Sequence, residues 1–121
     1  NAATGNQALY FNTTGSYNTA NGVNSLYSNT TGSYNTAFGN AALNANTTGT
    51  YNNAHGKNSL FKNTTGSYNA AFGDAALYTT TTGNYNTALG SAAGGLNSTG
   101  SGNVFIGYYF FKHYHSINKN I

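Results

Sequence analysis

The chain has 121 residues, but charged side chains make up only 4% of them, against about 25% in an average soluble domain. Its four lysines are scattered and arginine is absent, which excludes the clustered basic face typical of nucleic-acid binding. The absence of cysteine excludes disulfides and thiolate chemistry. No apolar run approaches the roughly 18 residues of a membrane-spanning helix.

The first residues belong to a repeat that has already begun. Residues 1–5 match residues 35–39, which form the second half of a repeat unit. The end of a repeat array exposes unpaired backbone groups unless something caps it. We therefore expect either further residues before Asn1 or another molecule that covers this end.

Residues 5–107 repeat with a period of 17 residues and without insertion or deletion. The consensus unit is Gly-x-x-Ala/Ser-Leu-Tyr-x-Asn-Thr-Thr-Gly-Ser-Tyr-Asn-Thr-Ala-Phe. We call the residues that share one position in successive units a column, named by its first full-unit member. Two columns are pure glycine: Gly5, Gly22, Gly39, Gly56, Gly73, Gly90 and Gly107, and Gly15, Gly32, Gly49, Gly66, Gly83 and Gly100.

A unit of 17 residues is too short for a pair of packed helices. Its Thr, Asn, Tyr and Phe residues favour strands and turns. The sequence therefore predicts an all-β parallel β-solenoid, or β-roll, of about six to seven 17-residue coils. Each coil would be short strands joined by turns, with glycines of positive φ at the corners. Neighbouring coils would hydrogen-bond about 4.8 Å apart.

The small residues predict a thin interior. We expect the Ala8 column, the Ala20 column and part of the Leu9 column to face inward. The Leu9 and Tyr17 columns would then be available to pack against another chain, and the Asn and Thr columns could form hydrogen-bonded ladders.

The last unit, residues 90–107, is degenerate because Gly94, Gly95 and Gly102 replace Leu, Tyr and Tyr. We therefore divide the chain into a solenoid array, 1–107, and an aromatic tail, 108–121. The tail is predicted to cap the array or to dock onto another subunit. The residues expected to dock are Tyr108, Tyr109, Phe110, Phe111, Tyr114, Ile117 and Ile121.

The repeat resembles one found in bacterial and phage tail-fibre-like proteins, which often carry an endosialidase-type chaperone domain. Residues 5–20 carry this resemblance, and residues 100–108 resemble the segment that often ends such arrays. More distantly, residues 35–39 resemble the head repeats of trimeric autotransporter adhesins. The resemblance implies a surface or virion fibre that is frequently trimeric. The chain departs from the family after Tyr108, where no chaperone domain follows.

An Asn-x-Thr/Ser pattern recurs in the repeat and is a candidate for N-glycosylation. The candidate residues are Asn12, Asn29, Asn46, Asn63 and Asn97, and Thr80 interrupts the series. The simpler interpretation is a turn that favours Asn and Thr before Gly. The Thr13 and Thr14 columns are alternative positions for O-linked sugars.

Catalytic and metal sites are not predicted. Asp74 is the one carboxylate side chain, and Lys57 of the preceding coil is its expected weak partner. His113 and His115 would face the same side of a strand, but a zinc site needs three or four protein ligands. The one other histidine, His55, is far away in the sequence. We expect neither an enzyme nor a cofactor.

The leading functional hypothesis is a structural module of an extracellular or virion fibre that self-assembles into a filament or a trimer. One alternative is an adhesin segment that binds cell-surface carbohydrate through Tyr, Asn and Thr. Another is an ice-binding solenoid, although alternation on a strand would send Thr13 and Thr14 to opposite faces. The expected partners are copies of the chain itself and glycans, either covalent or on another cell.

Overall fold

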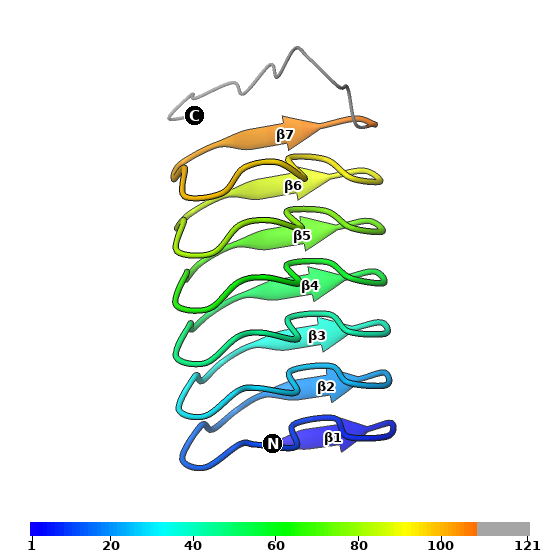
Figure 1. Ribbon diagram of the computed structural model, residues 1–121, viewed down its shortest axis with the longest axis vertical. Coiled ribbons are helices and arrows are strands. Elements are labelled where there is room, and N and C mark those ends of the chain that lie inside the picture. Colours follow the sequence, from blue (N-terminus) through cyan, green and yellow to red (C-terminus); the bar gives the residue numbers. More distant parts are fainter. Residues whose placement is uncertain (109–121) are drawn as a thin grey trace.

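The computed structural model describes residues 1–108, which form seven parallel strands stacked in chain order along a rod (Figure 1). The strands are β1 (Ala2–Thr4), β2 (Thr19–Asn21), β3 (Thr36–Phe38), β4 (Asn53–His55), β5 (Ala70–Phe72), β6 (Thr87–Leu89) and β7 (Val104–Ile106). Each strand pairs with the strands before and after it in the chain. The predicted parallel β-solenoid is therefore confirmed. Within residues 1–108, no helix is long and apolar enough to cross a membrane.

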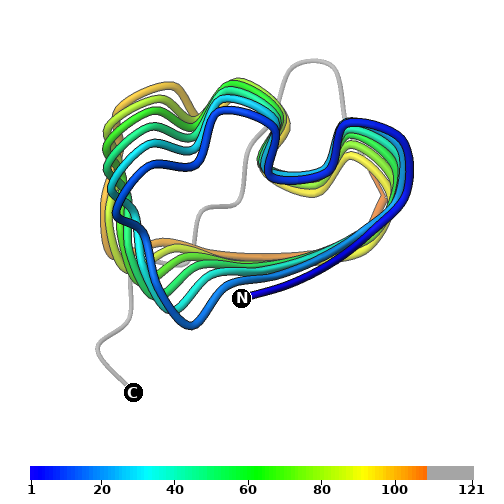
Figure 2. The ribbon, with the colours of Figure 1, turned by 90° about the horizontal axis from the view of Figure 1, so that it is seen from below.

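Neighbouring coils pair residues that are 17 positions apart, so each column runs along the rod. Between β2 and β3, Thr19 lies beside Thr36 and Ala20 beside Ala37. Seen along the rod, successive coils superimpose with a gradual rotation (Figure 2). The constant unit length preserves this register, because one added residue would turn the following side chains to the other face.

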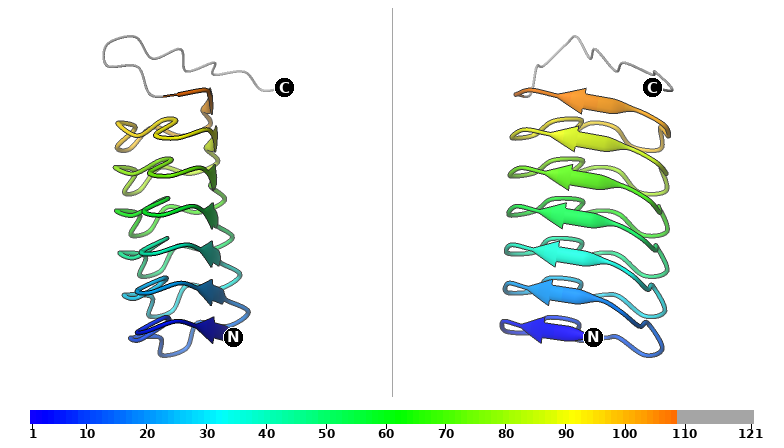
Figure 3. Two further views of the ribbon diagram at one scale, coloured as in Figure 1. Left: turned by 90° about the vertical axis from the view of Figure 1, so that its right-hand side faces the viewer. Right: turned by 180° about the vertical axis from the view of Figure 1, so that it is seen from behind.

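Each coil contains one strand of three residues rather than several short strands. All the strands lie on one side of the rod, and turns make up the remainder of each coil (Figure 3). Left-handed backbone angles explain why each coil has one strand, because they interrupt the extended chain at three positions per coil. In the second coil these are Asn24 (φ 59°), Leu26 (φ 49°) and Tyr34 (φ 59°).

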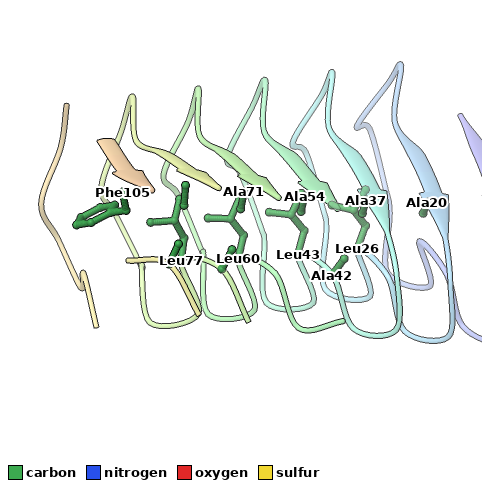
Figure 4. Packing of buried hydrophobic residues seen from close by; sticks show 13 residues of the cluster. Ala20, Leu26, Ala37, Ala42, Leu43, Ala54, Leu60, Ala71, Leu77 and Phe105 are labelled. Atoms are coloured by element: carbon green, nitrogen blue, oxygen red, sulfur yellow. The ribbon is translucent and has the colours of Figure 1, made fainter. Parts of the chain in front are cut away.

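The core is a double row of small and branched side chains inside the rod (Figure 4). The central residue of each inner strand is a fully buried alanine, such as Ala37 in β3, and the Leu9 column faces this row. The Ala8 column is also buried from the second coil onward, as predicted. Burying each leucine contributes about 1.5–3 kcal/mol.

The interpretation that the Leu9 column packs against another chain is wrong. Leu26, Leu43, Leu60 and Leu77 are inaccessible to solvent within their own rod. The left-handed φ of each leucine turns the backbone so that this side chain enters the coil instead of following the alternation of a strand.

The two glycine columns are required for different reasons. Gly39 has a φ of +126°, and a Cβ on it would lie 2.7 Å from the carbonyl carbon and oxygen of Gly56. Gly49, in the other column, has no positive φ, so the prediction of a left-handed corner there is wrong. A Cβ on Gly49 would instead collide with the Gly66 carbonyl oxygen of the next coil.

We predict that Gly39→Ala destabilises the rod by about 2–5 kcal/mol, combining backbone strain with overpacking. Denaturant unfolding followed by circular dichroism measures this change. The matched control is Asn40→Ala at the neighbouring exposed position, which should change stability by less than about 0.5 kcal/mol. Equal effects of the two substitutions would contradict the close approach of coils at Gly39.

Candidate functional surfaces

A column of buried asparagines joins the coils through their side-chain amides. The Asn35 backbone N–H donates to Asn18 Oδ1 at 2.9 Å, and Asn35 Nδ2 donates to the Gly49 carbonyl oxygen at 2.8 Å. The Asn35 backbone therefore bonds to the coil before it, and its side chain bonds to the coil after it, where Oδ1 also accepts from the Asn52 N–H at 3.0 Å. Asn52 repeats this pattern with Asn35 and Gly66, and both asparagines are fully buried.

We predict that Asn52→Ala costs about 1–3 kcal/mol, because it leaves the Asn69 N–H buried without its acceptor and removes one of the two bonds to the Gly66 carbonyl, which Asn63 Nδ2 also contacts. Asn53→Ala is the matched control, since Asn53 is exposed and Ala70 holds the same position in the next coil. Differential scanning calorimetry on the full chain compares the two. If they melt at the same temperature, the amide ladder does not stabilise the rod.

The Asn12 column, which carries the candidate glycosylation sites, forms a second ladder inside the rod. Asn46 Nδ2 donates to Asn29 Oδ1 at 2.7 Å and to the Gly49 carbonyl oxygen at 3.1 Å. Both amide hydrogens are therefore used. In the fifth coil Thr80 replaces the asparagine, and its Oγ1 donates to the Asn97 carbonyl oxygen at 2.7 Å.

The hydrogen bonds of this ladder restrict which asparagines could carry an N-linked glycan. N-glycosylation itself remains a prediction. Asn29, Asn46 and Asn63 are fully buried, whereas Asn12 and Asn97 are partly exposed. A glycan on Nδ2 would replace a hydrogen-bonding amide hydrogen and would need space inside the coil. The Asn-x-Thr pattern contains no signal for this burial, because the side-chain direction depends on the turn.

We predict that any N-linked glycan on the folded chain is attached at Asn12 or Asn97 and not at the three buried asparagines. Peptide mapping of native material by mass spectrometry, with and without enzymatic removal of N-glycans, locates the modification. Glycosylation of Asn46 at high occupancy in folded protein would contradict the ladder.

The Tyr17 column forms a ladder of stacked rings on the outside of the rod. Its ring centroids are 4.7–5.0 Å apart with planes within 12° of parallel. The members are Tyr17, Tyr34, Tyr51, Tyr68 and Tyr85. The faces of the inner rings are covered by their neighbours, so only ring edges and hydroxyl groups meet solvent there.

A second outward column follows the exposed end of the strands, and sequence reasoning missed it. Phe38, His55 and Phe72 stack with centroids 5.1 and 4.9 Å apart, and Leu89 and Ile106 continue the column. We call these five residues the apolar stripe. The consensus unit ends in Phe at this position, but His55, Leu89 and Ile106 replace it in other coils, so the repeat pattern alone did not indicate an outward column.

Two further aromatic groups lie on a third column, which Asn44 interrupts. Tyr10 stacks on Tyr27 at 5.6 Å, and Phe61 stacks on Tyr78 at 5.2 Å. Asn44 Nδ2 turns away to donate to the Asn24 carbonyl oxygen at 3.1 Å. Asn44 therefore interrupts the stacked rings, while its own side-chain amide keeps a hydrogen-bond partner.

The threonine columns lie at the surface on a turn rather than on a strand. Thr30 Oγ1 donates to the Thr47 carbonyl oxygen at 3.1 Å, and this bond recurs along the Thr13 column. The Thr14 column is exposed in every coil. Strand alternation, from which Thr13 and Thr14 were expected to face opposite sides, does not apply because these residues lie on a turn. Ice binding by these columns remains a prediction.

The few titratable residues are dispersed. His55 is held between Phe38 and Phe72, and Lys57 and Asp74 are exposed, where an ion pair contributes little. Residues 1–108 contain no group of three side chains able to hold a metal ion. His113 and His115 lie outside the described residues.

Of the predicted docking residues, only Tyr108 lies in the described part of the chain, and its side chain is exposed. Tyr109, Phe110, Phe111, Tyr114, Ile117 and Ile121 lie beyond it. Comparisons with protein-family models, curated proteins and solved structures find no match to this chain. The resemblance to tail-fibre-like repeats therefore remains a prediction.

Proposed function

We propose that the chain is a structural module of an extracellular or virion fibre, which assembles into a filament or a trimer. The observation that carries this proposal is the unchanging bonding between coils. The Leu26 N–H donates to the Ala42 carbonyl oxygen at 3.0 Å, and the Leu43 N–H repeats this bond with Ser59 at 3.0 Å. A rod built in this way can be lengthened by any number of coils without a change of structure.

When one end of a molecule binds the opposite end of the next copy and the contact does not close into a ring, repeated binding produces an open filament. Each inner coil donates to and accepts from both of its neighbours, since the Leu26 N–H donates to Ala42 in the next coil and the Tyr34 N–H donates to Ser16 in the coil before. The backbone amides of Thr30, Thr31 and Gly32 all approach the Thr47 carbonyl oxygen at 3.0–3.2 Å. A coil from a second copy offers the same carbonyl, so end-to-end assembly would reuse bonds already present within the chain.

Low charge supports the same function. In a solenoid, equal charges in one column would lie about 4.8 Å apart and would repel one another. The rod instead uses neutral Asn, Thr and Ser columns, whose side chains bond along the axis. Neutral side chains that bond along the axis suit a long structural rod more than a site for acid–base catalysis.

The apolar stripe supports lateral assembly. Phe38, Phe72, Leu89 and Ile106 are exposed apolar residues that follow one line along the rod. Continuous apolar surface of this kind usually marks an interaction site. In a trimer or a bundle of filaments, this stripe would lie between rods.

We predict that the full chain forms filaments or trimers and that Phe38→Ser combined with Phe72→Ser weakens the lateral association at least tenfold. Sedimentation velocity and negative-stain electron microscopy report the two modes of assembly. The matched control is Thr31→Ser combined with Thr65→Ser on the exposed Thr14 column, which should assemble like the unmodified chain. A folded protein that stays monomeric at all accessible concentrations would overturn the fibre proposal.

A further inference from the structure

The tyrosine ladder lacks its last rung. Gly102 occupies the position that holds tyrosine in the five preceding coils. Its backbone keeps the register, because the Gly102 N–H donates to the Asn84 carbonyl oxygen at 2.9 Å, as Tyr34 does to Ser16. Its φ of 70° is also close to the 57° of Tyr85. The ring alone is missing at this level of the rod.

The missing ring leaves one face of Tyr85 open. Tyr34, Tyr51 and Tyr68, which have rings on both sides, are 43–48% exposed, whereas Tyr85 is 65% exposed. The extra exposure corresponds to the face that a ring at position 102 would cover. The break at Asn44 in the Tyr10 column differs, because Asn44 carries a side chain, which donates to the Asn24 carbonyl oxygen of the preceding coil.

Neutral polar residues lie next to Tyr85 in the chain and next to Gly102 in the following coil. The Asn84 backbone N–H donates to Ser101 Oγ at 2.9 Å, which places this hydroxyl next to the residue that precedes Tyr85. Asn84 Oδ1 accepts from the Ser67 N–H at 2.8 Å, so the Asn84 amide bonds to the coil before it, on the opposite side from Gly102. Thr87, two residues after Tyr85, is exposed. None of these residues carries a charge.

We propose that Tyr85 and the space above Gly102 form a binding site for one neutral pyranose ring. The ladder shows that a ring is accommodated 4.7–5.0 Å from its neighbour along this column. A pyranose presents a face of C–H groups to an aromatic face and a rim of hydroxyls to its surroundings. The Ser101 and Thr87 hydroxyls are suited to that rim.

The polar rim favours a sugar over a planar aromatic compound. A hydrocarbon ring would cover Tyr85 equally well but would make no hydrogen bonds with the neighbouring hydroxyls. The absence of charge on these neighbours favours a neutral sugar over a sialic or uronic acid. The site does not depend on fibre assembly, because all its groups belong to two adjacent coils of one chain.

The test titrates the full chain with neutral methyl glycosides of glucose, galactose and N-acetylglucosamine. Saturation-transfer NMR detects the sugar, and amide shifts of Gly102 and Tyr85 locate it. With a single ring face available, we expect a Kd on the order of 1 mM. At least one glycoside should shift the Gly102 amide.

Two leucine substitutions should each weaken glycoside binding at least tenfold while preserving the fold. Gly102→Leu covers the face of Tyr85, and Tyr85→Leu removes that face and covers Tyr68. Leucine suits this backbone, since Leu26 and Leu43 adopt φ of 49° and 51° in the same rod. Tyr51→Leu is the matched control at an inner rung and should leave binding unchanged. Circular dichroism confirms that each variant is folded.

Three results would overturn the proposal. One is a folded chain that binds none of the glycosides at tens of millimolar, a concentration well above the expected Kd. Another is glycoside binding that Gly102→Leu does not change. The third is binding of p-cresol at this position without binding of any sugar, which would make the site one for aromatic compounds.

Discussion

A column of buried asparagines, each bonded through its backbone N–H to the coil before it and through its side chain to the coil after it, is the constraint on which this rod depends. Asn35 joins Asn18 in the preceding coil to Gly49 in the following one. A buried polar group without its partner costs roughly 1–3 kcal/mol, so every coil must present the same groups at the same height. Unit length, glycine positions and column identity all follow from that requirement.

The interior is small, and stability therefore comes from stacking. Each inner coil buries one leucine and small Ala or Ser residues, while three positions adopt left-handed angles. Such angles cost about 1–2 kcal/mol each for residues other than glycine, so three of them cost about 3–6 kcal/mol, more than the roughly 1.5–3 kcal/mol from burying the leucine. Bonds between coils must supply the balance, which is typical of repeat proteins whose units are stable only with neighbours.

The sequence predicted the solenoid, the register and the inward Ala8 and Ala20 columns because strict 17-residue columns leave few other folds. It did not predict the number of strands per coil, since left-handed Leu26 and Tyr34 have no signature in residue type. For the same reason, the sequence did not indicate that Asn29 points inward, since an Asn-x-Thr pattern usually belongs to an exposed turn. The apolar stripe was missed because its members differ in identity.

Perfect repetition also limits what the surface can bind. Where a column is complete, each outward ring covers the next, as Tyr34 covers Tyr51, and each Thr13-column hydroxyl bonds to the next coil, as Thr30 does to Thr47. The groups that could hold a ligand are thus already used between coils. Free ring faces and unused polar atoms arise where a column changes residue, as at Gly102. In a rod of this kind, a complete column uses its groups between coils, and a change of residue in the repeat is what leaves a group free.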